Sequence, residues 1–206
     1  MSDQNVATPT RRGFLRGAGL GAAAVAAGLT IPALPGVAGR ANAYPAPPVE
    51  GFVVPISRQE VIDRAMFWVN NPRPYNMQGF DVGPENDRNI LWRTDCSGFV
   101  SMALKARFTD NPTGQTTETL HPALGYNISH EIKPQDLKAG DFVLQRNQDS
   151  STGIGHVVLF HRWLDDQGTY EGMEQAGGVG TTMRPIKFGY DGLPGYHAFR
   201  YNHIRD

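Results

Sequence analysis

The residues best suited to chemistry are a lone cysteine and a histidine sixty positions further along the chain. Cys96 stands in the string DCSGFV at positions 95–100, and His156 stands in the string GHVVLF at positions 155–160. A thiol is mostly protonated near neutral pH, so a hydrolase that uses one needs an imidazole to take up its proton and pass it to the leaving amine. The two strings therefore predict a cysteine nucleophile and its base.

The segment that follows Cys96 predicts a helix from 96 to about 108, with the cysteine in its first turn. A helix N-terminus presents unpaired amides and the positive end of the dipole, both of which favour a thiolate and can receive a developing oxyanion. The alternative is a buried structural cysteine that behaves as a small apolar residue. The polar neighbours Asp95 and Ser97 and the long preceding loop favour the reactive cysteine.

His156 is the preferred base among the six histidines of the chain. Side chains alternate along a strand, so His156 and His161 point to opposite faces and only one of them can meet Cys96. His156 begins its strand, and Gly155 before it leaves room for close approach.

A third polar group should orient the imidazole. The strand predicted at 169–175 ends in Glu174 and Gln175, which point to opposite faces, so geometry permits only one of them. Periodicity alone leaves both candidates open.

The first 43 residues predict a twin-arginine export signal. Arg11 and Arg12 precede an Ala/Gly-rich apolar stretch over 17–39, and the tripeptide at 41–43 offers small residues for cleavage. The length also suits a membrane-spanning helix, but Pro32 and Pro35 interrupt it and large aliphatic side chains are few.

The expected mature chain starts at Tyr44 and has 163 residues, which suits one domain. Of the 19 basic and 20 acidic residues, four arginines and one aspartate fall in the signal, so the mature balance is −4. This balance does not favour nucleic acid or an anionic membrane as a partner. One cysteine excludes an internal disulfide, and the histidines lack metal-ligand spacing, so no metal site is expected.

The remaining sequence predicts an α+β domain. The proline-rich segment 44–56 is typical of a linker, and the domain is expected over 57–206. Ser57 and Glu60 form a capping box for a helix over 58–69, and 70–93 is expected to be a long loop. Five antiparallel strands are expected at 141–145, 156–161, 169–175, 181–186 and 197–201, separated by turn residues.

The strings at 95–100 and 155–160, with LKAGDFVL at 137–144 between them, resemble the NlpC/p60-type cell-wall peptidases in order and spacing over about 57–200. The resemblance implies a papain-like fold in which N-terminal helices, including the helix that carries the cysteine, pack on a five-stranded antiparallel sheet. It also implies cleavage of peptidoglycan stem peptides next to γ-linked D-glutamate and diaminopimelate.

By position, the resemblance makes Cys96 the nucleophile and His156 the base. It favours Gln175, which precedes Ala176, as the third catalytic residue, and it leaves Glu174 to line the substrate site. Tyr75 resembles a tyrosine that lines the site in the family. Asp95 and Ser97 match positions that hold the free amine of the substrate peptide in some relatives.

Three functions follow as hypotheses. The first is an exported cysteine peptidase or amidase that acts on peptidoglycan peptide, needs no cofactor and depends on the twin-arginine translocase for export. The second is a thiol amidase or acyltransferase that acts on an amide outside the wall. The third is a non-catalytic domain that binds wall fragments.

Overall fold

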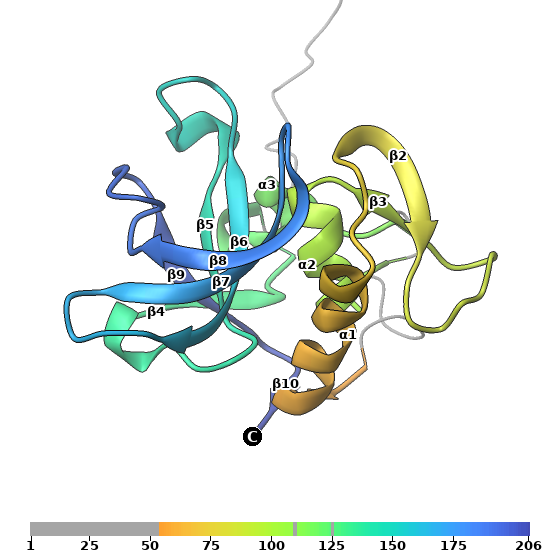
Figure 1. Ribbon diagram of the computed structural model, residues 1–206, viewed down its shortest axis with the longest axis horizontal. Coiled ribbons are helices and arrows are strands. Elements are labelled where there is room, and N and C mark those ends of the chain that lie inside the picture. The colour runs from red at the N-terminus through yellow and green to blue at the C-terminus, as the bar shows by residue number, and fades with distance from the viewer. Residues whose placement is uncertain (1–53, 109–110, 125) are drawn as a thin grey trace, which may run out of the picture. The chain divides into compact units, whose positions relative to one another are not determined.

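The computed structural model describes residues 54–108, 111–124 and 126–206 (Figure 1). The expected export signal at 1–43 and most of the expected linker at 44–56 lie outside these residues. Within the described part of the chain, no helix is both long and apolar enough to cross a membrane.

Three α-helices precede the main sheet, each with a side chain that caps its N-terminus. They are α1 (Arg58–Asn70), α2 (Cys96–Leu104) and α3 (Thr117–Leu120). The Ser57 hydroxyl accepts a hydrogen bond from the Glu60 amide at 3.1 Å, as the capping box predicts. Helix α2 ends earlier than expected, because Lys105 adopts a left-handed conformation with φ of +53°.

Ten strands and three 3₁₀ turns complete the described chain. The strands are β1 (Ile56–Ser57), β2 (Asn76–Val82), β3 (Leu91–Thr94), β4 (Ser129–Ile132), β5 (Phe142–Gln145), β6 (His156–Trp163), β7 (Thr169–Ala176), β8 (Gly180–Lys187), β9 (His197–Tyr201) and β10 (Ile204–Arg205). The 3₁₀ turns are η1 (Pro122–Leu124), η2 (Pro134–Asp136) and η3 (Asn147–Asp149).

The main sheet has six strands in the order β4-β9-β5-β6-β7-β8, each antiparallel to its neighbours. The five expected strands are present as β5 to β9, so the expectation of a five-stranded sheet is wrong by one edge strand. The additional strand, β4, pairs with β9 and precedes the region where strands were expected. It closes the edge that β9 would otherwise leave open.

The expectation of a long loop at 70–93 is also wrong, because this segment contains the hairpin of β2 and β3. Turn-forming residues occupy its tip around 83–89, while Phe80, Val82, Leu91 and Trp92 lie in the paired strands. A register shift between Asn76 and Phe80 interrupts the pairing, which obscures the strand pattern in the sequence.

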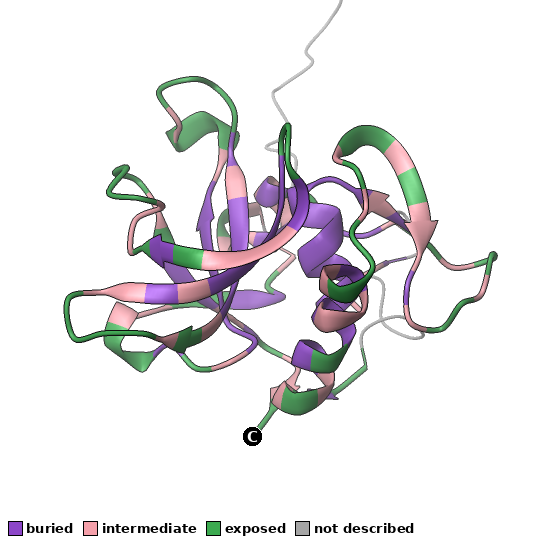
Figure 2. Cartoon of the chain, viewed as in Figure 1, coloured by how far each residue is buried: buried purple, intermediate pink, exposed green. Residues whose placement is uncertain are grey.

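Helix α2 lies in the centre of the core, and all nine of its residues are buried. It packs between α1 and the sheet face that carries Val157, Leu159 and Met173 (Figures 1 and 2). A helix that is mostly apolar and buried on every side needs such a position. A second apolar cluster, which includes Val158 and Phe160, lies on the opposite face of the same strands. The core therefore holds the N-terminus of α2 fixed against β6 and β7.

Candidate active site

Cys96 is the first residue of α2, and Asp95 caps this helix. One carboxylate oxygen of Asp95 accepts a hydrogen bond from the Gly98 amide at 2.6 Å. A side chain at Gly98 would place its Cβ 2.1 Å from the Arg93 carbonyl oxygen, so only glycine allows this tight entry into the helix. Helix geometry leaves the amides of Cys96 and Ser97 without intrahelical acceptors, which makes them available to an oxyanion beside the thiol.

His156 is the first residue of β6 and its imidazole meets both Cys96 and Glu174. Gly155 before it is buried against β5, where a Cβ would lie 2.5 Å from the Gln145 carbonyl oxygen. Burial acts to lower the pKa of His156, but hydrogen bonds and charge from Cys96 and Glu174 outweigh it and raise the pKa to about 9. These two neighbours therefore favour the protonated form of the imidazole.

Glu174, rather than Gln175, holds the imidazole. The Nε2 atom of His156 lies 2.6 Å from Glu174 Oε2, and the Glu174 side chain is fully buried. Burial alone would raise the pKa of Glu174, but His156 and Arg184 together lower it, so the carboxylate is charged. With Nε2 engaged, Nδ1 is the nitrogen left for Cys96.

Gln175 points to the other face of the sheet, where its side chain makes structural hydrogen bonds. Its amide nitrogen donates to the Arg73 carbonyl oxygen at 3.0 Å and to the Thr94 carbonyl oxygen at 3.2 Å, and its oxygen accepts from Thr181 at 2.5 Å. These bonds tie β7 to the segments before β2 and before α2. The expectation that Gln175 orients His156 is therefore not met by this geometry.

A β-bulge in β6 decides between the two candidates. Next to the turn, Trp163 pairs with Tyr170, a register that would put His156 on the same face as Gln175. The register shifts between Phe160 and Arg162, so that Leu159 pairs with Met173. This shift of one residue puts Glu174 on the face of His156.

Two further side chains hold Glu174 and were missed in the sequence. Arg184 Nε donates to Glu174 Oε1 at 2.7 Å, and the Tyr190 hydroxyl donates to Oε2 at 3.0 Å. Arg184 also pairs with Asp191 at 2.9 Å. Arg184 in β8 pairs with Gly172 in β7, two residues from Glu174, so the strand register could have suggested Arg184 as a partner of Glu174. Tyr190 lies in a loop with φ of +57°, and no sequence pattern points to it.

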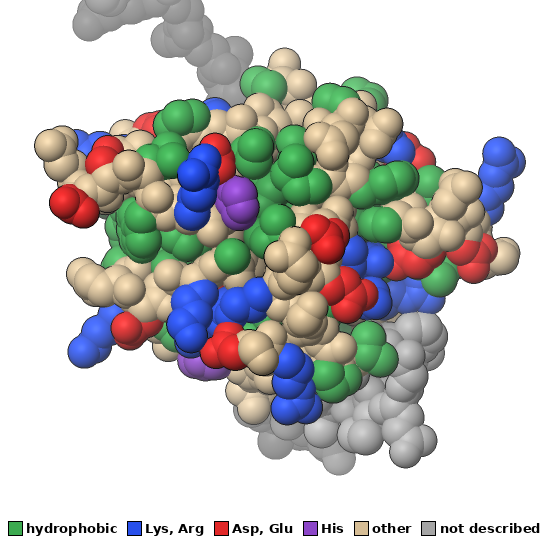
Figure 3. All heavy atoms as spheres, turned by 60° about the horizontal axis from the view of Figure 1, so that its bottom comes forward, with side chains coloured by type: hydrophobic (Ala, Val, Ile, Leu, Met, Phe, Trp, Pro, Cys, Tyr) green, Lys and Arg blue, Asp and Glu red, His purple; other side chains and the backbone are tan. Residues whose placement is uncertain are grey.

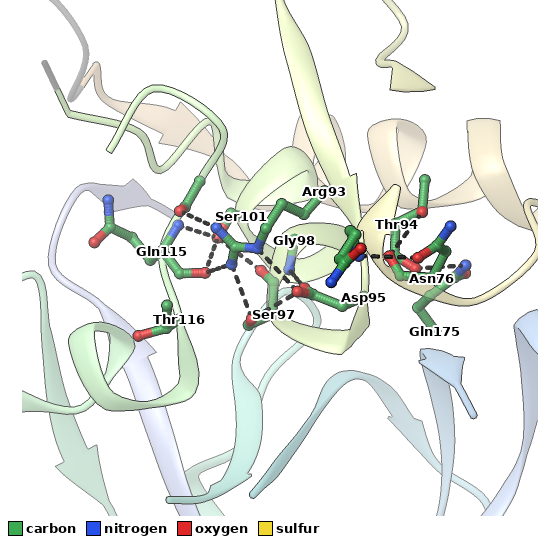
Figure 4. A network of polar contacts seen from close by, with 12 residues as sticks. Asn76, Arg93, Thr94, Asp95, Ser97, Gly98, Ser101, Gln115, Thr116 and Gln175 are labelled. Atoms are coloured by element: carbon green, nitrogen blue, oxygen red, sulfur yellow. Dashed lines mark hydrogen bonds and ion pairs between the residues drawn. The ribbon is translucent and has the colours of Figure 1, made fainter. Parts of the chain in front are cut away.

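The side chains of Asp95 and Ser97 bind the guanidinium of Arg93 (Figure 4). Arg93 donates to Asp95 Oδ2 at 2.9 Å and to the Ser97 hydroxyl at 3.1 Å. It also donates to the carbonyl oxygens of Gly114 at 2.8 Å and Gln115 at 2.5 Å. The other oxygen of Asp95 serves the helix cap. The two residues therefore bind a guanidinium of the chain itself, where a free substrate amine was expected.

Tyr75 lies beside the cysteine, just before β2. Burial and the nearby charges of Cys96 and Asp95 raise its pKa to about 12, so the hydroxyl keeps its proton and can donate. Tyr75 also lines a cavity with His156.

One cavity borders the imidazole, and a second lies next to that cavity. The larger, of about 720 Å³, is lined by His156, Glu174 and Tyr75, and the smaller, of about 290 Å³, is lined by Tyr196. Thr152 and Ile154 line both and so separate them. A third cavity, of about 500 Å³, lies beside Trp163, at the opposite end of β6 from the site.

Charge on the face drawn in Figure 3 is mixed in sign. Acidic and basic side chains lie next to one another there, with hydrophobic side chains between them. Among the described residues, no group of three histidine, cysteine or carboxylate side chains could hold a metal ion.

A model of the NlpC/P60 family matches residues 73–183, which is more than half of the chain. The match includes Cys96, His156 and Glu174 but ends before Arg184 and Tyr190. A search of curated proteins found no match. The α+β architecture of the described residues is compatible with the family's fold, and the matched family is one of cysteine peptidases and hydrolases of the cell wall. The chain belongs to the NlpC/P60 family.

Proposed function

We propose that this protein is an exported cysteine peptidase or amidase that hydrolyses amide bonds of peptidoglycan stem peptides. The single observation that carries the proposal is a cysteine at a helix N-terminus next to an imidazole that a buried carboxylate holds. Membership of the NlpC/P60 family supports the wall as the source of the substrate.

In the proposed mechanism, Cys96 and His156 form a thiolate and an imidazolium before substrate arrives. The Cys96 sulfur attacks the amide carbonyl carbon, and the amides of Cys96 and Ser97 receive the oxyanion. The proton on Nδ1 of His156 passes to the departing amine, the carbon–nitrogen bond breaks, and a thioester remains. Water then gives a proton to His156 and attacks the thioester, which releases the acid and restores the thiol pair.

Glu174 takes the role of third catalytic residue in this proposal. Its carboxylate accepts a hydrogen bond from the Nε2–H group, fixes the ring and stabilises the imidazolium. Arg184 and Tyr190 keep the carboxylate oriented through their bonds to its two oxygens. Tyr75 lines the same cavity as His156 and would contact the substrate there.

The proposed location is outside the cytoplasm, after export by the twin-arginine translocase. The support is the Arg11-Arg12 segment followed by an Ala/Gly-rich stretch and a small-residue cleavage site at 41–43.

An amide outside the wall is the second candidate substrate. The observation that favours it is the bond of Arg93 to Asp95 and Ser97, because a substrate with a free amine finds these two positions already filled. Transfer of the acyl group to an amine, in place of water, would use the same pair of residues.

The experiment is mass spectrometry of the products after the protein is incubated with defined muropeptides that contain diaminopimelate. Cys96→Ala should lower the cleavage rate at least about 10⁴-fold, because the nucleophile is removed, while circular dichroism stays unchanged. New fragments from the wild type alone support a wall peptidase and locate its bond. Cleavage by Cys96→Ala at the wild-type rate would contradict the proposed mechanism.

A further inference from the structure

The cavity of about 720 Å³ beside His156 has an aliphatic rim. Met77 in β2, Ile154 before β6 and Val179 in the turn between β7 and β8 all line it. Their exposed fractions are 67%, 69% and 70%. One strand and two loops thus each contribute one large apolar side chain that the fold does not cover.

This concentration is not typical of the rest of the surface. Eight large hydrophobic side chains are exposed in the described part of the chain. Three of them line the larger cavity, and a fourth, Leu193, lines the smaller cavity next to it. Exposed apolar side chains that gather around a concave site are typical of ligand recognition.

The charged groups that line the larger cavity are engaged with one another. Glu174 is bound by His156, Arg184 and Tyr190, and Arg184 is bound by Glu174 and Asp191. The imidazolium and the guanidinium together balance the two carboxylates. A charged substrate group would lose hydration on entry and would have to compete with these internal pairs.

A ligand in this cavity reaches the reactive pair. His156 and Tyr75 both line it, and both lie next to the Cys96 sulfur, whose charge affects the pKa of each. A group that fills the cavity is therefore held next to the bond that Cys96 attacks.

We infer that this cavity is a subsite for an uncharged aliphatic group of the substrate, attached next to the scissile amide. The assignment of that amide rests on the proposed function, whereas the preference for an aliphatic group rests on the cavity alone. The substrate class is a peptide or acyl amide that presents a side chain such as that of alanine, valine or leucine to Met77, Ile154 and Val179.

The test is the rate of Cys96 alkylation by iodoacetamides with different nitrogen substituents, followed by mass spectrometry of the full chain. The thiolate forms a carbon–sulfur bond, the carbon–iodine bond breaks and iodide leaves. The reagents are N-isobutyl, N-carboxymethyl and N-(2-aminoethyl) iodoacetamide, and each rate is divided by the rate with N-acetylcysteine. This readout needs no turnover.

We expect the N-isobutyl reagent to react about tenfold faster than the two charged reagents, because burial of one aliphatic group gives a preference of roughly that size. Ile154→Ser and Val179→Ser should each reduce the preference. Leu164→Ser is the matched control: Leu164 is 40% exposed, follows the far end of β6 and lines neither the larger nor the smaller cavity. It should keep the preference.

Equal normalised rates for the three reagents, or no reaction of Cys96 with any of them, would overturn the subsite. Preference for the N-carboxymethyl reagent would also overturn it and would identify Arg184 as an anion site. Selective alkylation in a protein that cleaves no amide would support the subsite and contradict the proposed function. Amide cleavage together with unselective alkylation would support the proposed function and contradict the subsite.

Discussion

Two buried carboxylates stand next to the reactive pair, and each is bound by an arginine. Asp95 immediately precedes Cys96 and is bound by Arg93, while Glu174 binds His156 and is bound by Arg184. The partners of Asp95 are a guanidinium, a hydroxyl and a helix amide. Glu174 instead holds an imidazole that can give up a proton.

This difference gives different roles to the Asp95 cluster, formed by Asp95, Arg93 and Ser97, and to the Glu174 cluster, formed by Glu174, His156 and Arg184. The Asp95 cluster fixes the start of α2 and so determines where the cysteine lies. The Glu174 cluster lies at the cavity and sets the protonation of the base. Damage to the first should therefore lower stability, and damage to the second should lower the reaction rate.

Among changes to the two carboxylate clusters, the largest effect is expected for Glu174→Gln. The variant keeps a side chain of similar shape but removes the charge that stabilises the imidazolium, so kcat/KM should fall roughly a hundredfold to a thousandfold. The pKa of His156 should fall from about 9, which moves the alkaline limb of the pH–rate profile to lower pH. Steady-state kinetics between pH 6 and pH 10 measure both changes.

Gln175→Ala is the matched control in the same strand. It removes the bonds to Arg73, Thr94 and Thr181 and should lower the unfolding free energy by about 1–3 kcal/mol. The pH–rate profile should stay unchanged. A shift of the profile in Gln175→Ala but not in Glu174→Gln would reverse the assignment of the third residue.

The same pKa gives a prediction for stability. Because folding raises the pKa of His156 from 6.5 to about 9, the folded state holds this proton more tightly than the unfolded state. The resulting stabilisation is complete below about pH 6.5 and is lost as the pH rises through about 9. Thermal unfolding should show this loss in the wild type and a smaller one in Glu174→Gln.

Arg93→Met is expected to have the next largest effect, and on stability. It leaves the Asp95 carboxylate buried without its cation, which should lower the unfolding free energy by about 3 kcal/mol. The position of the pH–rate profile should not move. Urea unfolding measures the change, with Arg162→Met as control, since Arg162 makes only an exposed pair with Glu171 and its loss should change little. Equal unfolding midpoints for the two variants would contradict the structural role of the Asp95 cluster.

Local signals predicted much of the fold. The capping box at Ser57 and Glu60 placed α1 to within one residue, and turn residues separated the strands that became β5 to β9. The hairpin of β2 and β3 was missed because its register shift breaks the alternation that identifies strands. The edge strand β4 was missed because it is short and its partner, β9, is almost seventy residues away.

The candidate site could be predicted only in part. Cys96 and His156 came from two local strings, but the choice between Glu174 and Gln175 depends on a bulge between Phe160 and Arg162. A shift of one residue in register exchanges the faces of a strand, and sequence spacing does not reveal it. Arg93 was not recognised as the partner of Asp95, because only the folded backbone brings its guanidinium to the carbonyl oxygens that hold it.

The most direct test of the account is the rate at which Cys96 reacts with iodoacetamide at pH 7 and at pH 10, in the wild type and in His156→Gln. If His156 holds a thiolate at neutral pH, the wild type should react at least about tenfold faster than the variant at pH 7. The difference should nearly vanish at pH 10, where an ordinary thiol is ionised without help. Equal rates at pH 7 would show that the imidazole does not activate Cys96 and would contradict the central claim.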